Sequence, residues 1–374
     1  MARDRAKYFR WQRRRARRAE RRATKLLRRK IARNRAHERA LGIAPLQWSP
    51  SEASLAPTLE CPERLNLSGD YESTILFLQK VRMVSSTFSG RFRVNLCPLK
   101  EITPAAALLM VAEFDRWNEL LSPLKIRPID IDDWNPAVRT KLNEMGFFEL
   151  LSAKKDFEEV LTDEERFLPF LSGHRSEGDQ AKRLRLAIEA LGPKLKDRQA
   201  LYDGLVEAMT NVSHHAYNQG WPVPRWWMSA SVNAKSGRLT VMFLDHGMTI
   251  PKTLPLSDLW ENVRGMLFQM GAALTGLALS DDAQLIQAAM LVERSRTEEE
   301  HRGNGLPRDI LGYVKTHSSS GRLRIFSRHG KYTFRKLADG STTVETTTLP
   351  VPLKGTFIEW TIEDYAEGES DDPN

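Results

Sequence analysis

The stretch EAMTNVSHHA, residues 207–216, contains three polar side chains spaced four residues apart. Glu207, Asn211 and His215 occupy positions i, i+4 and i+8, so on an α-helix they drift by only about 80° and form one polar stripe. The apolar side chains of the same segment fall within an arc of roughly 80° on another face: Leu201, Leu205, Met209, Val212 and Ala216. The spacing therefore predicts an amphipathic helix with a carboxylate, a carboxamide and an imidazole along one flank. The alternative is an ordinary helix with a mixed polar flank.

Two predicted strands further along the chain carry polar residues or glycine at their ends. The apolar, β-branched run over residues 238–244 predicts a strand that ends at Asp245, with Gly247 two positions later. The carboxylate would lie at the edge of a sheet, and the glycine would let the backbone approach a ligand closely. A second apolar run, over residues 357–362, directly follows Thr356. Both runs thus predict strands that have, at or next to one end, a polar side chain that could contact a ligand.

A glycine-rich turn lies between these two strands in the sequence. Gly303 and Gly305 precede Leu306, and the residues Pro307–Lys315 have the pattern of a helix. Free N–H groups at such a turn and helix start can cradle phosphates. Each of these patterns is a common turn when taken singly. The polar helix, the Asp-x-Gly strand end, the glycine turn and the final strand are much harder to obtain by chance in this order and with this spacing.

With these motifs, residues 195–364 resemble the ATPase domain shared by gyrase, heat-shock chaperones and histidine kinases (GHKL). The helix motif is especially similar to that of anti-sigma-factor serine kinases. The resemblance implies ATP and Mg²⁺ as ligands, and an α/β sandwich in which a mixed sheet is covered by helices on one face. One position departs from the family pattern, because Thr249 replaces the second glycine of the first glycine box. A β-branched residue tolerates positive φ poorly, so we expect a reshaped loop there.

The resemblance also implies roles for the matching residues. Asp245 and Gly247 would form the adenine-binding box, with the carboxylate accepting from the adenine amino group. Asn211 would hold Mg²⁺, and Glu207 would act as the general base towards water or a protein hydroxyl. The other nucleotide contacts would come from His215, Gly303, Gly305, Leu306 and Thr356. For Glu207, Asn211 and Asp245 the alternative is a structural role, and His215 could instead pack beside Tyr217.

Residues 63–152 form a second predicted unit, of α/β class. Strand and helix patterns alternate over residues 91–97, 104–121, 125–130 and 135–145. This order resembles the STAS fold of anti-sigma-factor antagonists, in which a serine of a switch loop is phosphorylated by a partner kinase. The corresponding position is Ala105, which has no hydroxyl, so the resemblance implies a module that docks a protein partner. The alternative is a small α/β domain of no assigned type.

The charge of the chain is concentrated at the N-terminus. Residues 1–40 contain 15 Arg and 3 Lys against three acidic residues, a net charge of +15, whereas the whole chain carries +8. Residues 1–44 therefore form a basic arm, disordered or helical, on a mildly acidic body. Three roles stay open for the arm: binding of nucleic acid through residues 1–40, a tether between subunits of a homo-oligomer, or a solvated tail.

The remaining segments and the composition complete the expected organisation. Residues 45–62 are proline-rich and predict a linker, residues 153–194 a connector, and residues 365–374 an acidic tail. Two cysteines give no disulfide framework, which favours a reducing cytoplasm. The longest apolar stretch, residues 265–279, is too short to span a bilayer, so we expect no membrane association.

The pattern favours an ATP-dependent conformational switch, with slow ATP hydrolysis, that regulates a partner or a nucleic-acid-bound complex. One alternative is a serine/threonine protein kinase that acts on a separate partner. Another is a nucleotide-binding module without turnover. The identity of the partner and the oligomeric state do not follow from the sequence.

Overall fold

The computed structural model describes most of the chain between residues 58 and 363. The described residues are 58–87, 92–121, 126–153, 165–174, 178–191, 198–211, 216, 224–257, 260–270, 281–299, 306–316 and 319–363, with seven single positions in the basic arm. The rest of the arm, residues 45–57 of the predicted linker and the acidic tail lie outside them.

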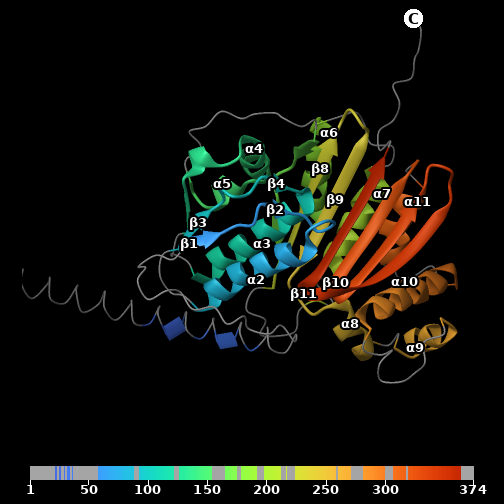
Figure 1. Cartoon of the computed structure of the whole chain (residues 1–374). Helices are drawn as coiled ribbons and strands as arrows, with labels where there is room; N and C mark the ends of the chain where they lie inside the picture. Colours follow the sequence, from blue (N-terminus) through green and yellow to red (C-terminus); the bar gives the residue numbers. More distant parts are fainter. Residues whose placement is uncertain are drawn as a thin grey trace, which may run out of the picture.

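The N-terminal part of the described chain is a small α/β unit (Figure 1). Three parallel strands pair in the order β1-β3-β5, and the short strands β2 and β4 form a second parallel pair. The strands are β1 (Thr58–Glu60), β2 (Arg64–Leu65), β3 (Phe92–Asn95), β4 (Glu101–Ile102) and β5 (Ile126–Ile129). The helices are α2 (Tyr71–Thr87), α3 (Pro104–Leu121), α4 (Pro136–Met145) and α5 (Phe147–Leu150), with a 3₁₀ turn at Ile131–Asp133.

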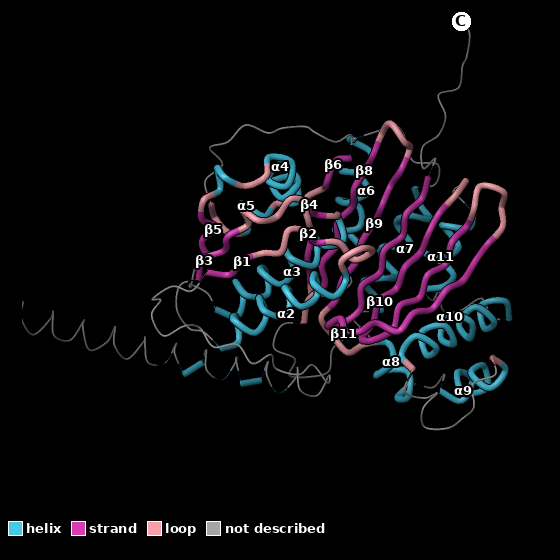
Figure 2. Tube along the Cα trace, viewed as in Figure 1, coloured by secondary structure: helices cyan, strands magenta, loops and turns pink. Residues whose placement is uncertain are grey.

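A six-stranded sheet forms the centre of the molecule, and its long strands run side by side in Figure 2. The order is β10-β11-β9-β8-β6, and β7 also pairs with β8. The strands are β6 (Glu165–Phe167), β7 (Leu171–Gly173), β8 (Trp226–Asn233), β9 (Arg238–Asp245), β10 (Gly321–Lys336) and β11 (Thr342–Glu363). The helices of this part are α6 (Gly178–Leu191), α7 (Arg198–Asn211), α8 (Ile250–Thr253), α9 (Trp260–Gln269), α10 (Asp282–Glu299) and α11 (Leu306–Thr316), with a 3₁₀ turn at Leu254–Leu256.

The α/β class and the main elements agree with the sequence analysis, but four expectations need correction. Every pairing of the described strands of the large sheet is antiparallel, so this sheet is not mixed. Helices cover both faces of this sheet, whereas the resemblance implied helices on one face only. The predicted connector contributes β6 and β7, and the predicted linker contributes β1. These three short strands carry little pattern of their own and are held by pairing to β8 and β3.

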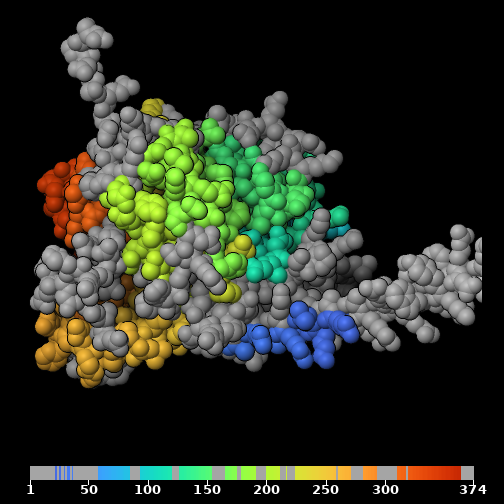
Figure 3. All heavy atoms as spheres, turned by 180° about the vertical axis from the view of Figure 1, so that it is seen from behind, coloured from blue at the N-terminus to red at the C-terminus, as the bar shows by residue number. Residues whose placement is uncertain are grey.

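Alternation along the strands divides the large sheet into two buried faces. One face carries Val241 and Phe243 and packs in a core with α6, α7 and α11. The opposite face carries Met242 and Leu244 and packs in a core with α2 and α3 of the small unit. Seen from behind, the lime-green atoms of the segment around α6 and α7 cover the middle of the molecule (Figure 3). The sheet is therefore the middle layer of three.

A buried charged cluster, which we call the Glu113 cluster, lies where α3 meets the large sheet. Glu113 of α3 accepts from Arg82 Nε of α2 at 2.9 Å and from Arg116 Nε at 3.1 Å. The ring of His246, just after β9, places Nε2 3.5 Å from the Glu113 carboxylate. Burial disfavours ionisation of Glu113, but Arg82 and Arg116 hold its pKa well below the usual range. Burial also keeps the pKa of His246 well below its ordinary value, so this ring is neutral.

In the described part of the chain, no helix is long and apolar enough to cross a membrane.

The Glu113 cluster predicts a large effect of removing one charge. Glu113→Gln leaves the buried Arg82 and Arg116 without a carboxylate, so urea denaturation at pH 7 should show a loss of about 3–5 kcal/mol. Because the pKa of Glu113 is depressed from its ordinary 4.5, its contribution is present above that pH and is lost as the pH falls. The acid-induced loss of stability below about pH 5 should therefore be smaller in the variant.

Glu119→Gln is the matched control on the same helix. Glu119 pairs with Arg225 at 2.8 Å, but its side chain is 35% exposed. We expect a loss of at most about 1 kcal/mol, because solvent screens such pairs. Equal losses for the two variants would contradict the assignment of the buried cluster as the main polar contact of α3.

Candidate functional site

Helix α7 forms as the sequence analysis predicts and presents its polar flank beside a buried face. Leu201, Leu205 and Met209 are buried in the core, while Glu207 is half-buried. The helix is described to Asn211, of which only the backbone placement is given. His215 lies outside the described residues. The apolar periodicity was therefore sufficient to orient the helix, while the position of the imidazole stays a prediction.

Asp245 is the last residue of β9, which is one of the central strands of the sheet. It is paired with Trp226 of β8 on one side and with Thr356 of β11 on the other. Its side chain follows Val241 and Phe243 in the alternation of β9, so it belongs to the face covered by α6, α7 and α11. Only 5% of its surface is exposed. A carboxylate thus stands at the edge of the buried core.

The environment of Asp245 leaves its charge poorly compensated. Its Oδ1 accepts from the Gly247 N–H at 2.7 Å, and the Thr356 N–H also favours the ionised form. These backbone donors offset only part of the cost of burial, which raises the pKa of Asp245 to about 7. Buried carboxylates are ordinarily paired with a cation or with several donors. Asp245 is therefore a natural acceptor for an amino group of a ligand.

Three hydroxyl groups lie next to this carboxylate in the fold: those of Ser327, Thr356 and Thr249. Ser327 Oγ of β10 lies 3.0 Å from Thr356 Oγ1 and accepts from the Ile250 N–H at 2.9 Å. The adjacent Thr249 is buried, and its Oγ1 has no hydrogen-bond partner among the described residues. Sequence reasoning did not identify Ser327, because its alignment with Thr356 depends on the register of β10 and β11. That register shifts just beyond Ser327, at an irregularity in the hairpin.

Two glycines allow chain segments to meet at this edge. A Cβ on Gly247 would lie 2.2 Å from the carbonyl oxygen of Ala216, and the Met248 N–H donates to that oxygen at 2.6 Å. Gly355 has φ of 75°, and a Cβ there would lie 1.8 Å from the Asp245 carbonyl oxygen. The Asp-x-Gly turn therefore contacts the segment that follows α7. Gly247 makes room for another part of this chain. The sequence analysis predicted instead that it makes room for a ligand.

Thr249 does not strain the loop, contrary to the expectation from the sequence. Its φ is −81° and its ψ is 153°, an extended conformation at the start of α8. A β-branched residue adopts this conformation readily, so nothing at this position requires glycine. A threonine at position 249 therefore has no backbone cost in this fold.

The structure brings together part of the predicted site. Asp245, Gly247 and Thr356 lie at one edge of the sheet, and α7 with Glu207 packs on the same side. Gly303 and Gly305 lie outside the described residues, and Leu306 begins α11, which packs on α7. Among the described residues, no group of three or more His, Cys, Asp or Glu side chains could hold a metal ion.

Two buried polar groups here are incompletely satisfied. Asp245 could accept from an amino group of a ligand such as adenine, and the hydroxyl of Thr249 has no hydrogen-bond partner among the described residues. The predicted metal ligand, Asn211, is the last described residue of α7. No known protein-family description matches this chain, and the search of curated proteins found no match either.

The raised pKa of Asp245 predicts a pH dependence of stability. The folded state holds this proton up to about pH 7, whereas the carboxyl has its ordinary pKa of 3.8 when unfolded. The folded state thus binds more protons between these values, and its stability falls as the pH rises through them. Asp245→Asn cannot titrate, so its urea-denaturation free energy should fall less between pH 5 and pH 8. Equal falls in wild type and variant would mean that the carboxyl titrates normally.

Proposed function

We propose that this protein is an ATP-dependent conformational switch with slow hydrolysis, which regulates a protein or nucleic-acid partner from the cytoplasm. The sequence resemblance to GHKL ATPases, with an N-terminal unit that resembles a STAS domain, supports ATP and Mg²⁺ as its ligands. One structural observation carries the switch itself. Asp245, the last residue of β9, belongs to the face that would hold adenine, whereas the next residue, His246, contacts Glu113 of α3 in the small unit.

The chemistry of the proposed site is divided among a few side chains. Asp245 accepts from the adenine amino group, and a charge-assisted hydrogen bond of this kind compensates its buried carboxylate. Glu207 would polarise the attacking water as general base, and the Asn211 amide oxygen would hold Mg²⁺. Bound Mg²⁺ neutralises charge on the phosphates. His215, Gly303, Gly305 and Leu306 would contact the phosphates, and Thr356 would lie beside adenine.

The switch works through the Asp245–Gly247 turn because the turn has little freedom. On one side, the Met248 N–H is bonded to Ala216 behind α7. On the other, His246 is only 1% exposed, with its ring centroid 4.7 Å from that of Trp227. Trp227 in turn donates to Asp115 of α3 at 2.8 Å. A ligand that shifts Asp245 therefore displaces groups that are packed against α3.

The small unit would serve as the output of this switch. Ala105 is 3% exposed and has no hydroxyl, so the position that matches the family's phosphorylated serine cannot be a phosphorylation site. We therefore propose that the small unit docks a protein partner. Binding of nucleic acid through residues 1–40 stays a prediction, because nearly all of that arm lies outside the described residues.

The first test is ligand-induced stabilisation. Saturating ATP with Mg²⁺ should raise the thermal midpoint of the full chain, because a ligand that binds the folded state stabilises it by mass action. Asp245→Asn and Asn211→Ala should lose most of this shift. The Glu113→Gln variant, whose change lies on the other face of the sheet, should keep a measurable shift. Identical shifts in wild type and both site variants would refute the site.

Turnover then separates the switch from a module that only binds. Glu207→Ala should keep the ATP-induced shift but release phosphate about 10²–10⁴ times more slowly, the span usual for a lost general base. Wild-type protein that binds ATP and releases no phosphate would be a non-hydrolysing module. Transfer of the phosphate to a co-purified protein would instead identify a kinase.

A further inference from the structure

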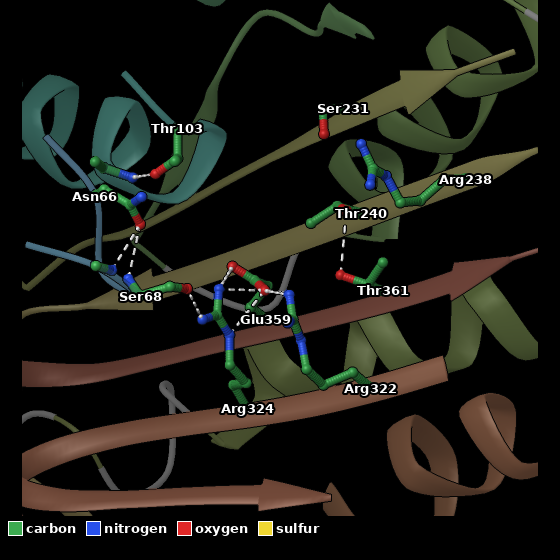
Figure 4. Close-up of polar contacts among 12 residues, drawn as sticks. Asn66, Ser68, Thr103, Ser231, Arg238, Thr240, Arg322, Arg324, Glu359 and Thr361 are labelled. Atoms are coloured by element: carbon green, nitrogen blue, oxygen red, sulfur yellow. Dashed lines mark hydrogen bonds and ion pairs between the residues drawn. The ribbon is translucent and has the colours of Figure 1, made fainter. Parts of the chain in front are cut away.

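A cavity of about 460 Å³ lies between the small unit and the large sheet, on the face opposite to Asp245. The small unit contributes Asn66, Ser68 and the residues Thr103–Ala105 at the start of α3. The sheet contributes polar side chains of β9, β10 and β11, several of which Figure 4 shows. The volume falls in the range of about 300–1,000 Å³ that is typical of small-molecule sites.

The cavity exists because the covered face of the sheet changes character along its strands. Near Asp245 a cross-strand row of this face is apolar: Trp227, Leu244, Phe357 and Phe326. The next rows contain Ser229, Glu359 and Arg324, and then Ser231, Thr240, Thr361 and Arg322. The apolar row packs against the small unit. The polar rows face it across the cavity, so this space is built from polar groups.

Positive charge dominates the cavity wall. Five cationic side chains line it against three carboxylates: Arg238, Arg322, Arg324, Arg335 and Lys336 against Glu165, Glu359 and Glu363. The first turn of α3 also faces the cavity, and the start of a helix carries partial positive charge. The wall thus has an excess of two positive charges, in a space partly shielded from solvent.

The carboxylates of the wall are already engaged. Glu359 accepts from Arg324 Nη2 at 2.6 and 2.7 Å and lies 3.2 Å from Arg322 Nη2. Arg324, whose side chain is 8% exposed, also donates to Ser68 Oγ at 2.6 Å and is thereby fixed in place. The other two carboxylates accept from serine hydroxyls, Glu165 from Ser231 of β8 and Glu363 from Ser320 just before β10.

Donors remain at the wall after these contacts are made. The Nε of Arg322 is buried and has no hydrogen-bond partner among the described residues. Burial and the neighbouring charge of Arg324 lower the pKa of Arg322, and Arg335 adds to that repulsion, while Glu359 offsets only part of it. Mutual repulsion of this kind is relieved by an anion bound between the guanidinium groups.

We propose that this cavity binds a small organic molecule that carries a phosphate group. Guanidinium groups recognise phosphate through paired N–H donors, and the excess of two charges matches a phosphate dianion. A single phosphate ion is much smaller than the cavity, so the site has room for the organic part of the ligand. The site is separate from the proposed nucleotide site, since alternation places its residues on the other face of the sheet.

Isothermal titration of the full chain with pyrophosphate, in about 150 mM NaCl to screen the basic arm, tests this site. Pyrophosphate represents the phosphate group of the ligand. We expect saturable binding to wild type, and binding weaker by about tenfold or more in Arg322→Gln and in Arg335→Gln, because each removes a charged donor. Arg335 is exposed, so its variant leaves the buried wall intact.

Arg127→Gln is the matched control, because Arg127 is an exposed residue of β5 outside the cavity. It should bind pyrophosphate as wild type does. The thermal midpoint of each variant without ligand shows whether the fold is retained. Absence of binding to wild type, or equal affinity in all three variants, would overturn the proposal, and equal affinity would move the anion to the nucleotide site or the arm.

Discussion

The contact between Glu113 and its buried neighbours is the constraint on which the three-layer arrangement depends. A carboxylate that is 1% exposed must be compensated, and the two arginines that compensate it come from α2 and α3 of the small unit. The same carboxylate faces His246, which belongs to the turn at the end of β9. Displacement of the small unit from the sheet would separate His246 from Glu113, whereas the two arginines would stay paired with it.

The contact with His246 is one of several that join the small unit to the sheet. The apolar row around Leu244 and Trp227 supplies non-directional burial, which alone would tolerate sliding of α3 across the sheet. Directional contacts prevent such sliding. Trp227 donates to Asp115, Tyr71 donates to the Val351 carbonyl, and Arg324 donates to Ser68. The polar half of the face stays separated from α3, which leaves the cavity.

The sequence predicted the limits of those helices and strands whose residues follow a single clear hydrophobic pattern. Helix α3 was predicted at its observed limits, Pro104–Leu121, since its proline marks the start and its apolar run is long. The strand β9 was predicted to end at Asp245, as it does. Helix α2 was missed, because residues on most of its surface are buried and the helical period is obscured.

Sequence patterns did not predict the contacts between residues far apart in the chain. His246 was treated as the unspecified residue of Asp-x-Gly, because nothing local indicates that its ring reaches Glu113, which is 133 positions away in the chain. Ser327 and Arg322 likewise acquire their neighbours only through the register of β10 with β11. Of the candidate site, the sequence could therefore identify the motif residues, but not the contacts that link them to the small unit.

That link is the central claim, and hydrogen exchange of the α3 amides with and without Mg²⁺-ATP tests it most directly. The account predicts that nucleotide changes the exchange of residues 104–121 in wild type, together with that of the turn after β9. In Glu113→Gln the turn should still respond while the response of α3 is greatly reduced. If nucleotide protects the turn and leaves α3 unchanged in the wild-type protein, the proposed coupling through His246 and Glu113 is wrong.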